Sequence, residues 1–322
     1  MKIAIIGASG LVGRKMIEIL QDRKNYDIIP YCSKKSAGKT IGDLQLIELT
    51  KQTIQKVDIA LFSAGSNVSK IWAKEFAELG AFVIDNSNAF RREKNIPLVL
   101  PEINSFLLNN QSKIIANPNC STIQIALPLF YLNKINKITK VIVSTYQSVS
   151  GAGQKGIEDL ENNTTKKFAY PISNNLIPQI DVALENGYTL EEDKINFELK
   201  KILSEQNISV LATAVRVPIK NCHGASVYVE FENEFDVKQA KSALSHKKGI
   251  TLQDDLENNI YPMPITCTNS DSVYVGRLRQ DPDNKKALLF WVVADNLRKG
   301  AATNAIEIMN IIEKTINETS PT

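Results

Sequence analysis

The sequence predicts an α/β protein of two domains, the first built on a parallel sheet and the second on a mixed one. At 322 residues the chain is longer than one ordinary domain. In its first third, short apolar runs alternate with segments of helical periodicity, which is the pattern of a parallel sheet with crossover helices. After residue 120, longer strand-like runs are joined by long connections. They predict a second, α+β domain with a mixed, largely antiparallel sheet.

The first domain begins with a short apolar run, residues 2–7, that ends in a glycine, as a buried parallel strand does. Apolar residues at helical spacing follow it over 11–20. Further strands are expected at 27–32, 57–63, 82–85 and 113–116, and a helix is expected over 66–79.

The second domain is predicted from strands at 141–146, 209–217, 225–231 and 286–293. The closing segment, 296–316, again has apolar residues at helical spacing, and its helix could pack back on the first domain. We therefore expect residues 1–118 together with 297–322 to form one domain, and residues 119–296 to form the other.

Composition and charge narrow the class of protein. A hydrophobic content of 43% with 23% charged residues is typical of a soluble globular chain with a full core. The 38 basic and 35 acidic residues are too evenly balanced to indicate nucleic acid or a membrane as the main partner. The longest apolar run, 287–294, is too short to span a membrane. Gly7 interrupts the apolar run at the N-terminus, which is therefore predicted to be a first strand and not a signal peptide.

The four cysteines lie far apart without C-x-x-C spacing. A zinc site or a disulfide framework is therefore not expected, no other metal site is indicated, and a reducing cytoplasm is the expected location.

A glycine pattern follows the first strand. In Gly7-Ala-Ser-Gly10-Leu-Val-Gly13 the glycines allow a tight turn and let backbone N–H groups approach a pyrophosphate at the start of a helix. The pattern predicts a Rossmann-type dinucleotide-binding domain, with a plain strand–turn–helix as the alternative.

The end of the second strand indicates which dinucleotide is bound. An acidic residue for a ribose 2′-hydroxyl is expected there, but the sequence reads Ser33-Lys34-Lys35-Ser36. Two ammonium groups and two hydroxyls suit a 2′-phosphate and favour NADP over NAD. The alternative is a solvated lysine pair on a surface loop.

Cys120 stands in Asn117-Pro-Asn119-Cys120, where a strand gives way to a helix-compatible apolar run. A thiol reacts as its thiolate, and a helix N-terminus lowers the thiol pKa. Cys120 is therefore a candidate nucleophile, and Asn119 is a possible donor to a carbonyl oxygen. A buried structural cysteine is the alternative.

The chain has two histidines that could serve as a base. His246 lies in a polar, helix-ending context and is expected to be solvated. His223 lies between two predicted strands, in a loop that Pro218 and Gly224 interrupt. Because loops at strand ends carry catalytic groups more often than cores do, His223 is the better candidate.

Several motifs occur in an order that resembles the aspartate-semialdehyde dehydrogenases over essentially the whole chain. They are GASGLVG, SKKSAGK, DNSNAFRREKNIPLVLPEIN, NPNCST, TYQSVSGAG, YTLEEDKINFELKKIL, RVPIKNCH and DNLRKGAA. The resemblance implies NADPH-dependent reductive dephosphorylation of L-aspartyl 4-phosphate to L-aspartate 4-semialdehyde. That product leads to lysine or diaminopimelate, threonine and methionine.

The resemblance also implies roles for individual residues. Cys120 would attack the acyl-phosphate carbon, phosphate would leave, and hydride would reduce the resulting thioester. His223 would be the general acid/base, Gln147 would orient the acyl intermediate, and Asn119 would lie beside the reacting oxygen.

Four further residues would bind the substrate. Arg216 would clamp its α-carboxylate and Glu192 would face its ammonium group, while Lys194 and Arg91 would bind the phosphate. Without the resemblance, Lys194 would be interpreted as part of a solvated helix face, and Arg91 as one of a surface pair.

The residues implied at the cofactor come from four segments. They are Gly7, Ser9, Gly10, Leu11, Val12 and Gly13; Ser33, Lys34, Lys35 and Ser36; Ser63, Ala64 and Gly65; and Ser150, Gly151 and Asn296. The family commonly has arginine where this chain has Lys34 or Lys35. Lysine contacts a phosphate as a point charge and lacks the two-pronged hydrogen bonding of arginine. Selectivity for NADP over NAD would then be weaker, and use of NAD as well is a hypothesis.

Other functions remain alternatives. N-acetyl-γ-glutamyl-phosphate reductase uses the same thioester chemistry, but its substrate amine is acetylated and needs no acidic partner such as Glu192. The motifs that surround the cysteine of glyceraldehyde-3-phosphate dehydrogenase are absent. A non-catalytic dinucleotide-binding relative is the third alternative, and the joint presence of Cys120, Gln147, Arg216 and His223 argues against it.

The resemblance further implies a homodimer built on the second domain, with pairing into tetramers left open.

Overall fold

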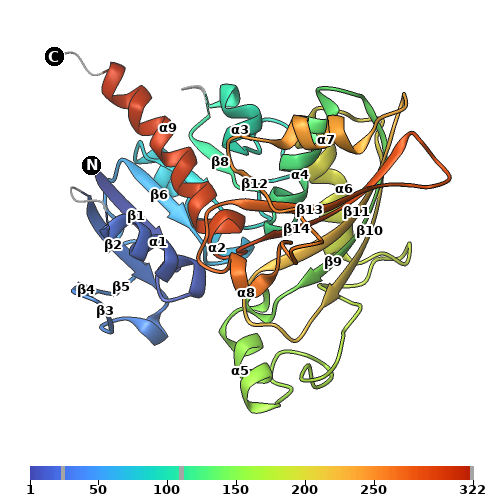
Figure 1. Ribbon diagram of the computed structural model, residues 1–322. Coiled ribbons are helices and arrows are strands. Elements are labelled where there is room, and N and C mark those ends of the chain that lie inside the picture. The colour runs from blue at the N-terminus through green and yellow to red at the C-terminus, as the bar shows by residue number, and fades with distance from the viewer. Residues whose placement is uncertain (23–25, 109–111, 320–322) are drawn as a thin grey trace. The chain divides into compact units, whose positions relative to one another are not determined.

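A computed structural model describes residues 1–22, 26–108 and 112–319 (Figure 1). The chain divides into two compact units, Met1–Asn119 with Ala301–Thr322, and Cys120–Gly300. The sequence placed the boundaries after residues 118 and 296. The end of its first-domain segment, 320–322, lies outside the described residues.

The first unit has a six-stranded sheet of order β5-β2-β1-β6-β7-β8, in which every pairing is parallel. The predicted strands and the helix over 66–79 are confirmed to within two residues at each end. The elements are β1 (Lys2–Ile6), α1 (Leu11–Gln21), β2 (Asp27–Cys32), η1 (Lys34–Ser36), β3 (Thr40–Ile41), β4 (Leu44–Gln45), β5 (Ile47–Glu48), β6 (Ile59–Phe62), α2 (Ser66–Glu78), β7 (Phe82–Asp85), α3 (Pro101–Asn104), η2 (Ser105–Leu107), β8 (Ile114–Ala116) and the closing helix α9 (Thr303–Thr319).

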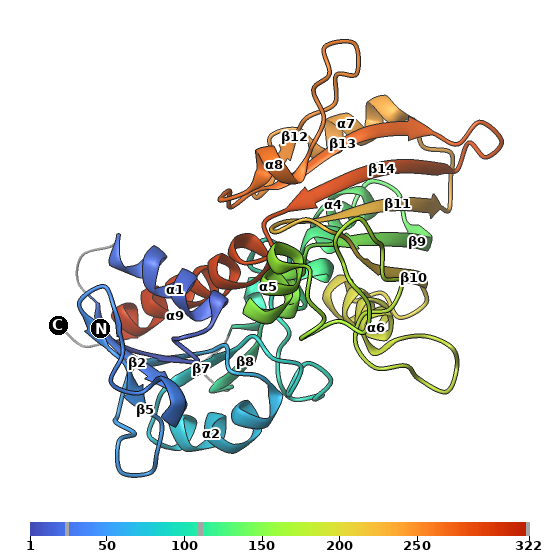
Figure 2. The same ribbon diagram turned by 90° about the horizontal axis from the view of Figure 1, so that it is seen from below.

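Helices cover both faces of this parallel sheet. Figure 2 shows α1 and α9 together on one face and α2 on the other. On the first face, Met16 of α1 and Met309 of α9 join one apolar core with Ile3 and Ile5 of β1. On the second face, the ring of Phe76 in α2 meets Phe62 edge-on. The closing helix therefore packs in the first unit, as the sequence predicted.

The second unit has a mixed six-stranded sheet of order β10-β9-β11-β14-β13-β12. The β10–β9 and β12–β13 pairs are parallel and the other pairs are antiparallel. The elements are α4 (Cys120–Asn133), β9 (Ile138–Gln147), η3 (Val149–Ala152), α5 (Gln154–Asn162), α6 (Leu190–Leu203), β10 (Ser209–Arg216), β11 (His223–Phe231), α7 (Val237–Leu244), β12 (Ile250–Leu252), α8 (Pro264–Cys267), β13 (Val273–Gln280), β14 (Ala287–Ala294) and the π-helical turn η4 (Arg298–Ala302).

The two faces of the mixed sheet differ. The helices α4, α6 and α7 pack on one face, where alternate residues such as Val141 and Val143 of β9 are buried. On the other face, the side chains of Ile142, Tyr146 and Leu211 are exposed. This alternation is that of a sheet with one face in the core and one that is partly exposed in the single chain.

A buried carboxylate organises the loop after α5. Asp159 accepts hydrogen bonds from the Thr164 hydroxyl and from the backbone N–H groups of Lys166, Lys167 and Phe168, all between 2.7 and 3.0 Å. Burial raises the carboxyl pKa, but these hydrogen bonds outweigh burial and lower the pKa of Asp159 to about 2. The loop places the Phe168 ring 6.0 Å from the guanidinium carbon of Arg216.

Replacement of Asp159 by asparagine is expected to destabilise the protein at neutral pH by roughly 2 kcal/mol, because one acceptor oxygen becomes a donor that faces N–H groups. The stabilisation by Asp159 is present above the unfolded pKa of about 3.9 and is lost as the pH falls toward its folded value. Denaturant midpoints at pH 7 and pH 3 measure both effects. Glu158→Gln, at a half-exposed ion pair with Lys166, is the matched control and should change little. Equal destabilisation by the two variants would contradict the role given to Asp159.

Candidate active site

The register of the mixed sheet brings three predicted site residues into one row. Gln147 at the end of β9 pairs with Arg216 at the end of β10 and with His223 at the start of β11. His223 also pairs with Ala294, the last residue of β14. Side chains of paired residues point to the same face of a sheet. All three side chains are buried on the face that the helices cover.

His223 opens β11, so its predicted position in a loop is wrong. The loop ends one residue earlier, at Cys222, whose backbone has a positive φ of 69°. Burial and the charge of Arg216 lower the pKa of His223 to about 3, although Glu191 acts in the opposite direction. The imidazole is therefore neutral over the physiological pH range. Its Nε2 atom is buried and has no hydrogen-bond partner in the described part of the chain.

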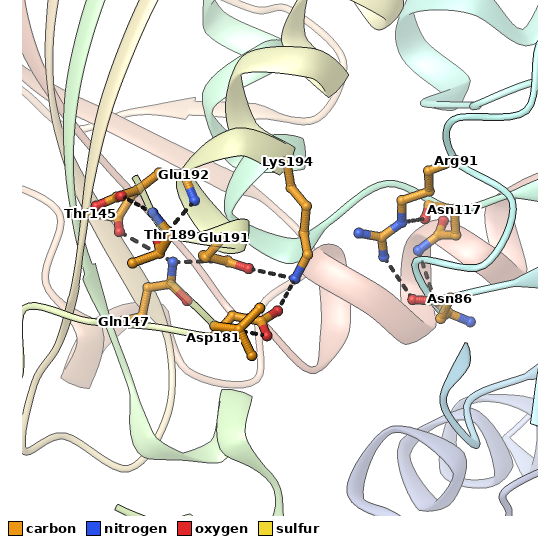
Figure 3. A network of polar contacts seen from close by, with 11 residues as sticks. Asn86, Arg91, Asn117, Thr145, Gln147, Asp181, Thr189, Glu191, Glu192 and Lys194 are labelled. Atoms are coloured by element: carbon orange, nitrogen blue, oxygen red, sulfur yellow. Dashed lines mark hydrogen bonds and ion pairs between the residues drawn. The ribbon is translucent and has the colours of Figure 1, made fainter. Parts of the chain in front are cut away.

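Gln147 belongs to a hydrogen-bonded network that extends through Lys194 to Asp181 (Figure 3). Its Nε2 donates to Glu191 Oε1 at 3.1 Å, and Glu191 Oε2 is 3.1 Å from Lys194 Nζ. Lys194 Nζ also lies 2.6 Å from Asp181 Oδ2. Burial disfavours the ammonium, but Glu191 and Asp181 outweigh it and raise the pKa of Lys194. With its side chain only 11% exposed, Lys194 does not belong to a solvated helix face.

The carboxylate of Glu192 is engaged elsewhere, so the structure does not support its predicted contact with a substrate ammonium. Glu192 Oε2 accepts the Thr189 N–H at 2.7 Å in a capping box, and Oε1 accepts the Ala214 N–H at 2.9 Å. Its neighbour Glu191 is the carboxylate that contacts Gln147 and Lys194. The sequence signal that was missed is Thr189-x-x-Glu192, which is the pattern of a capping box.

Arg216 is held beside the histidine. Its Nη1 donates to the carbonyl oxygen of Ser148 at 2.6 Å. Burial lowers the pKa of Arg216, while the charges of Glu191 and Cys120 raise it. A Cβ atom at Gly151 would lie 3.0 Å from Arg216 Nη1 and 3.1 Å from His223 Nε2. Gly151 therefore packs directly against both side chains.

Cys120 is the first residue of α4, as the sequence predicted. Its side chain is partly exposed, whereas the thiols of Cys32, Cys222 and Cys267 are buried. The turn η4 packs against it, because a Cβ atom at Gly300 would lie 3.0 Å from Cys120 Cβ. A thiol at the positive end of a 14-residue helix, with electrostatic influence on Arg216, has the environment that favours a thiolate.

Asn296 lies two residues after Ala294, the last residue of β14. Its side chain connects the loop after β9 to the segment that follows β14. Its Oδ1 accepts the Cys222 N–H at 2.9 Å, and its Nδ2 donates to Ser150 Oγ at 3.0 Å. Asp295 in turn accepts the N–H groups of Asn269, Leu297 and Arg298. Asn296 and Ser150 thus contact one another, which is consistent with the prediction that both residues lie at the cofactor.

The first unit contains the glycine loop. Gly7 has φ of 88°, and a Cβ atom there would lie 2.9 Å from the backbone of Ser63 and Ala64. A Cβ atom at Gly13 would approach the Gly7 carbonyl oxygen to 2.3 Å. Gly10 precedes α1, whose first two residues are Leu11 and Val12. The carbonyl oxygen of Ser9 accepts a hydrogen bond from the Arg14 side chain. The tight turn at a helix N-terminus suits a pyrophosphate.

Residues Ser33, Lys34 and Lys35 are exposed directly after β2, and Lys34–Ser36 forms the short helix η1. Gly65, with φ of 87°, precedes α2 after β6. Both segments follow the carboxyl ends of parallel strands, where ligands of open α/β sheets bind.

Arg91, also in the first unit, is buried and held by backbone carbonyl groups (Figure 3). Its Nε donates to Asn117 O at 2.9 Å and its Nη2 donates to Asn86 O at 2.7 Å. Asn117 Nδ2 donates to Asn86 Oδ1 at 2.7 Å. Arg91 is thus an oriented guanidinium and not one of a surface pair. Asn119 is buried immediately before Cys120.

The described residues, 1–22, 26–108 and 112–319, contain no group of His, Cys, Asp and Glu side chains that could hold a metal ion. No helix among them is both long and apolar enough to cross a bilayer.

Family models match both units. Residues 2–111 match the NAD-binding domain of semialdehyde dehydrogenases, and residues 128–299 match their dimerisation domain. The chain is therefore an oxidoreductase of the semialdehyde dehydrogenase class, with an N-terminal parallel sheet and a mixed-sheet second domain.

Whole-chain relatives narrow this class. The chain is 43% identical to the aspartate-semialdehyde dehydrogenase of Aquifex aeolicus, over 97% of this chain and 98% of the relative. It is 42% identical to that of Bacillus subtilis, over 97% of each chain. A crystal structure of aspartate semialdehyde dehydrogenase II from Vibrio cholerae, complexed with ASA, is 38% identical with a TM-score of 0.92, over 97% of this chain and 98% of that one. The chain belongs to the aspartate-semialdehyde dehydrogenases.

Proposed function

We propose that this chain converts L-aspartyl 4-phosphate and NADPH to L-aspartate 4-semialdehyde, phosphate and NADP, reversibly, through a thioester on Cys120. The observation that supports it best is the row of Arg216, Gln147 and His223 across the sheet of the unit whose first helix starts at Cys120. A nucleophile, a proton-carrying imidazole and a carboxylate-binding guanidinium are the groups that this reaction requires.

In the proposed mechanism, the Cys120 thiolate forms a bond to the acyl carbon and the carbon–oxygen bond to phosphate breaks, so that phosphate departs with the electron pair. NADPH held by the glycine loop would supply the hydride that the thioester carbon accepts. His223 places Nε2 toward the reacting oxygen, gives this oxygen a proton as hydride adds, and takes the proton back as the thiolate leaves and the aldehyde forms. Gln147 and Asn119 orient the same carbonyl group.

The substrate is recognised by charge. Arg216 pairs with the α-carboxylate in a bidentate arrangement. Glu191, and not Glu192, faces the ammonium group, because its carboxylate is part of the network with Gln147. Lys194 and Arg91 bind the phosphate. The acetylated amine of N-acetyl-glutamyl phosphate carries no positive charge for Glu191 to contact, which disfavours that substrate.

The adjacent pair of glutamates offers a sharp test. Glu191→Gln is expected to lower kcat/KM for the semialdehyde by roughly 10- to 100-fold, because a charge-assisted hydrogen bond is lost. Glu192→Gln is the matched control and is expected to cost about 1 kcal/mol of stability through the capping box, with kcat/KM nearly unchanged. Steady-state kinetics and thermal unfolding of both variants measure this. A large loss of kcat/KM in Glu192→Gln, with little change in Glu191→Gln, would instead indicate that Glu192 contacts the substrate.

We propose NADP as the preferred dinucleotide, bound by the glycine loop with Ser63, Ala64, Gly65, Ser150, Gly151 and Asn296. The exposed Lys34 and Lys35 after β2 would hold the 2′-phosphate. The double variant Lys34→Ala/Lys35→Ala is expected to lower kcat/KM for NADP about tenfold and to leave that for NAD unchanged. Added salt should diminish the wild-type preference, since exposed charges are screened. An equal loss with both cofactors would show that the lysines do not contact the 2′-phosphate.

The function itself is tested by NADPH formation from L-aspartate 4-semialdehyde, phosphate and NADP, with N-acetyl-glutamate semialdehyde as the control substrate. We expect phosphate-dependent turnover of the aspartyl substrate alone. Turnover of the acetylated substrate would move the chain to the other thioester reductase, and binding of NADP without turnover of either would indicate a non-catalytic relative.

We also propose that the chain works as a homodimer in the cytoplasm. The match to a dimerisation domain over 128–299 and the exposed Ile142, Tyr146 and Leu211 on the partly exposed sheet face support the dimer. Four free cysteines suit a reducing compartment. Sedimentation velocity distinguishes a dimer from a tetramer.

A further inference from the structure

Two hydrogen-bonding groups near His223 Nδ1 come from one residue, Ser148. The backbone N of Ser148 lies 3.0 Å from Nδ1, and its Oγ lies 3.2 Å from the same atom. Ser148 follows β9 directly and is fully buried. The other ring nitrogen, Nε2, has no partner in the described part of the chain.

The backbone group fixes the tautomer of the neutral ring. A backbone N–H can only donate, so Nδ1 must offer it a lone pair, and the single proton of the neutral imidazole then resides on Nε2. The nitrogen that is left without a protein partner is therefore the one that carries the proton.

The hydroxyl of Ser148 has the opposite capacity. It donates to Asn296 Oδ1 at 3.1 Å. The orientation of that amide is itself fixed, because its Oδ1 also accepts the Cys222 N–H at 2.9 Å. The same hydroxyl also lies 3.1 Å from Ser150 Oγ. When its hydrogen is directed to Asn296, a lone pair of Oγ faces Nδ1 and can accept a proton placed there.

We propose that Ser148 is a positioning residue for His223. Its N–H holds the neutral ring with the proton on Nε2. When Nδ1 takes up a proton, this hydrogen bond is lost, and the hydroxyl, oriented by Asn296, accepts the Nδ1–H of the imidazolium. This inference rests on the proposed acid/base role of His223.

The charged groups that act on the ring are Arg216, which opposes the imidazolium, and Glu191, which favours it. Burial opposes the imidazolium as well, and a backbone hydrogen bond with Cys222 favours it. A neutral acceptor at Nδ1 therefore offsets part of an environment that otherwise keeps the ring uncharged.

The tautomer can be measured without catalysis, because the chain has only two histidines. Nitrogen-15 spectra of histidine-labelled protein at pH 7 should show a pyridine-type Nδ1 and a pyrrole-type Nε2 for His223. The resonances of the exposed His246 are assigned with His246→Gln. A pyrrole-type Nδ1, or a mixture at His223, would overturn the role of the N–H.

The role of the hydroxyl is tested by Ser148→Ala, which keeps the N–H. The variant is expected to retain the tautomer but to lower kcat on the order of tenfold, with KM within about twofold. The profile of log kcat against pH should move by about one unit toward acid, since one pKa unit corresponds to a tenfold change.

Ser148→Thr restores a hydroxyl and should recover most of the activity. Ser144→Ala removes a hydroxyl from the opposite face of β9 and should leave the His223 resonances in place. An unmoved pH profile in Ser148→Ala, or an equal movement of the profile in Ser144→Ala, would overturn the proposal. If Thr does not fit this buried position, the pH profile of the alanine variant decides alone. Failure of the proposed chemistry would appear separately, as turnover that survives loss of Cys120.

Discussion

Cys120→Ala is expected to lower phosphate-dependent NADPH formation by at least about 10³-fold, because no other group can form the thioester. The variant should fold normally, since the lost sulfur is partly exposed at the first residue of α4. Binding of NADP should persist, because the glycine loop lies in the other unit. Steady-state assays together with fluorescence titration of NADP separate the two effects.

The matched control is Cys267→Ala, which removes a buried thiol in α8. This variant should lose some stability through the small cavity but should keep kcat within about threefold. Substantial turnover by Cys120→Ala would exclude a thioester on this residue, and a comparable loss in both variants would indicate damage to the fold.

His223→Asn is expected to lower kcat by roughly 10²- to 10⁴-fold, the usual contribution of a general acid/base. Asparagine is similar in size, and its carbonyl oxygen can accept the Ser148 N–H that now points at Nδ1. The site geometry should therefore survive while proton transfer does not. His246→Gln, at an exposed position, is the control and should retain full activity.

The stability of the His223→Asn variant should depend less on acid pH than the stability of the wild type. Folding holds the pKa of His223 at about 3, whereas the unfolded value is about 6.5. Below the unfolded pKa the unfolded chain binds a proton that the folded chain does not, so stability falls as the pH decreases toward 3. Asparagine removes this dependence. Urea midpoints at pH 8 and pH 5 should differ less in the variant than in the wild type, and an equal difference would contradict burial of a neutral ring.

Much of the fold could be predicted because its signals are local. The strands at 27–32 and 82–85 coincide with β2 and β7, since continuous apolar runs between polar turns have few other interpretations. The strand β13 was missed. Its sequence, VYVGRLRQ, interrupts the apolar pattern with a glycine and two arginines, and only its pairing with β14 makes it a strand.

The site was less predictable, because it depends on contacts between segments distant in the chain. Adjacent residues on α6 point in different directions, and the sequence alone does not show which glutamate meets Gln147. Ser148 carries no catalytic signature, and its relation to His223 arises from pairing across 75 positions. By contrast, Cys120 and the glycine loop were identifiable because their chemistry depends on a single strand-to-helix transition.

The closing helix has a consequence for how the protein is made. The first unit needs α9 in its core, yet α9 is synthesised after all of Cys120–Gly300. During translation the second unit can therefore complete its fold while the first still lacks one side of its core. Domains commonly fold in the order of their synthesis, but here that order is reversed. Until Met309 and its neighbours emerge, the apolar face formed by Ile3 and Ile5 needs protection, and chaperones that bind exposed apolar strands are expected to engage the nascent chain there.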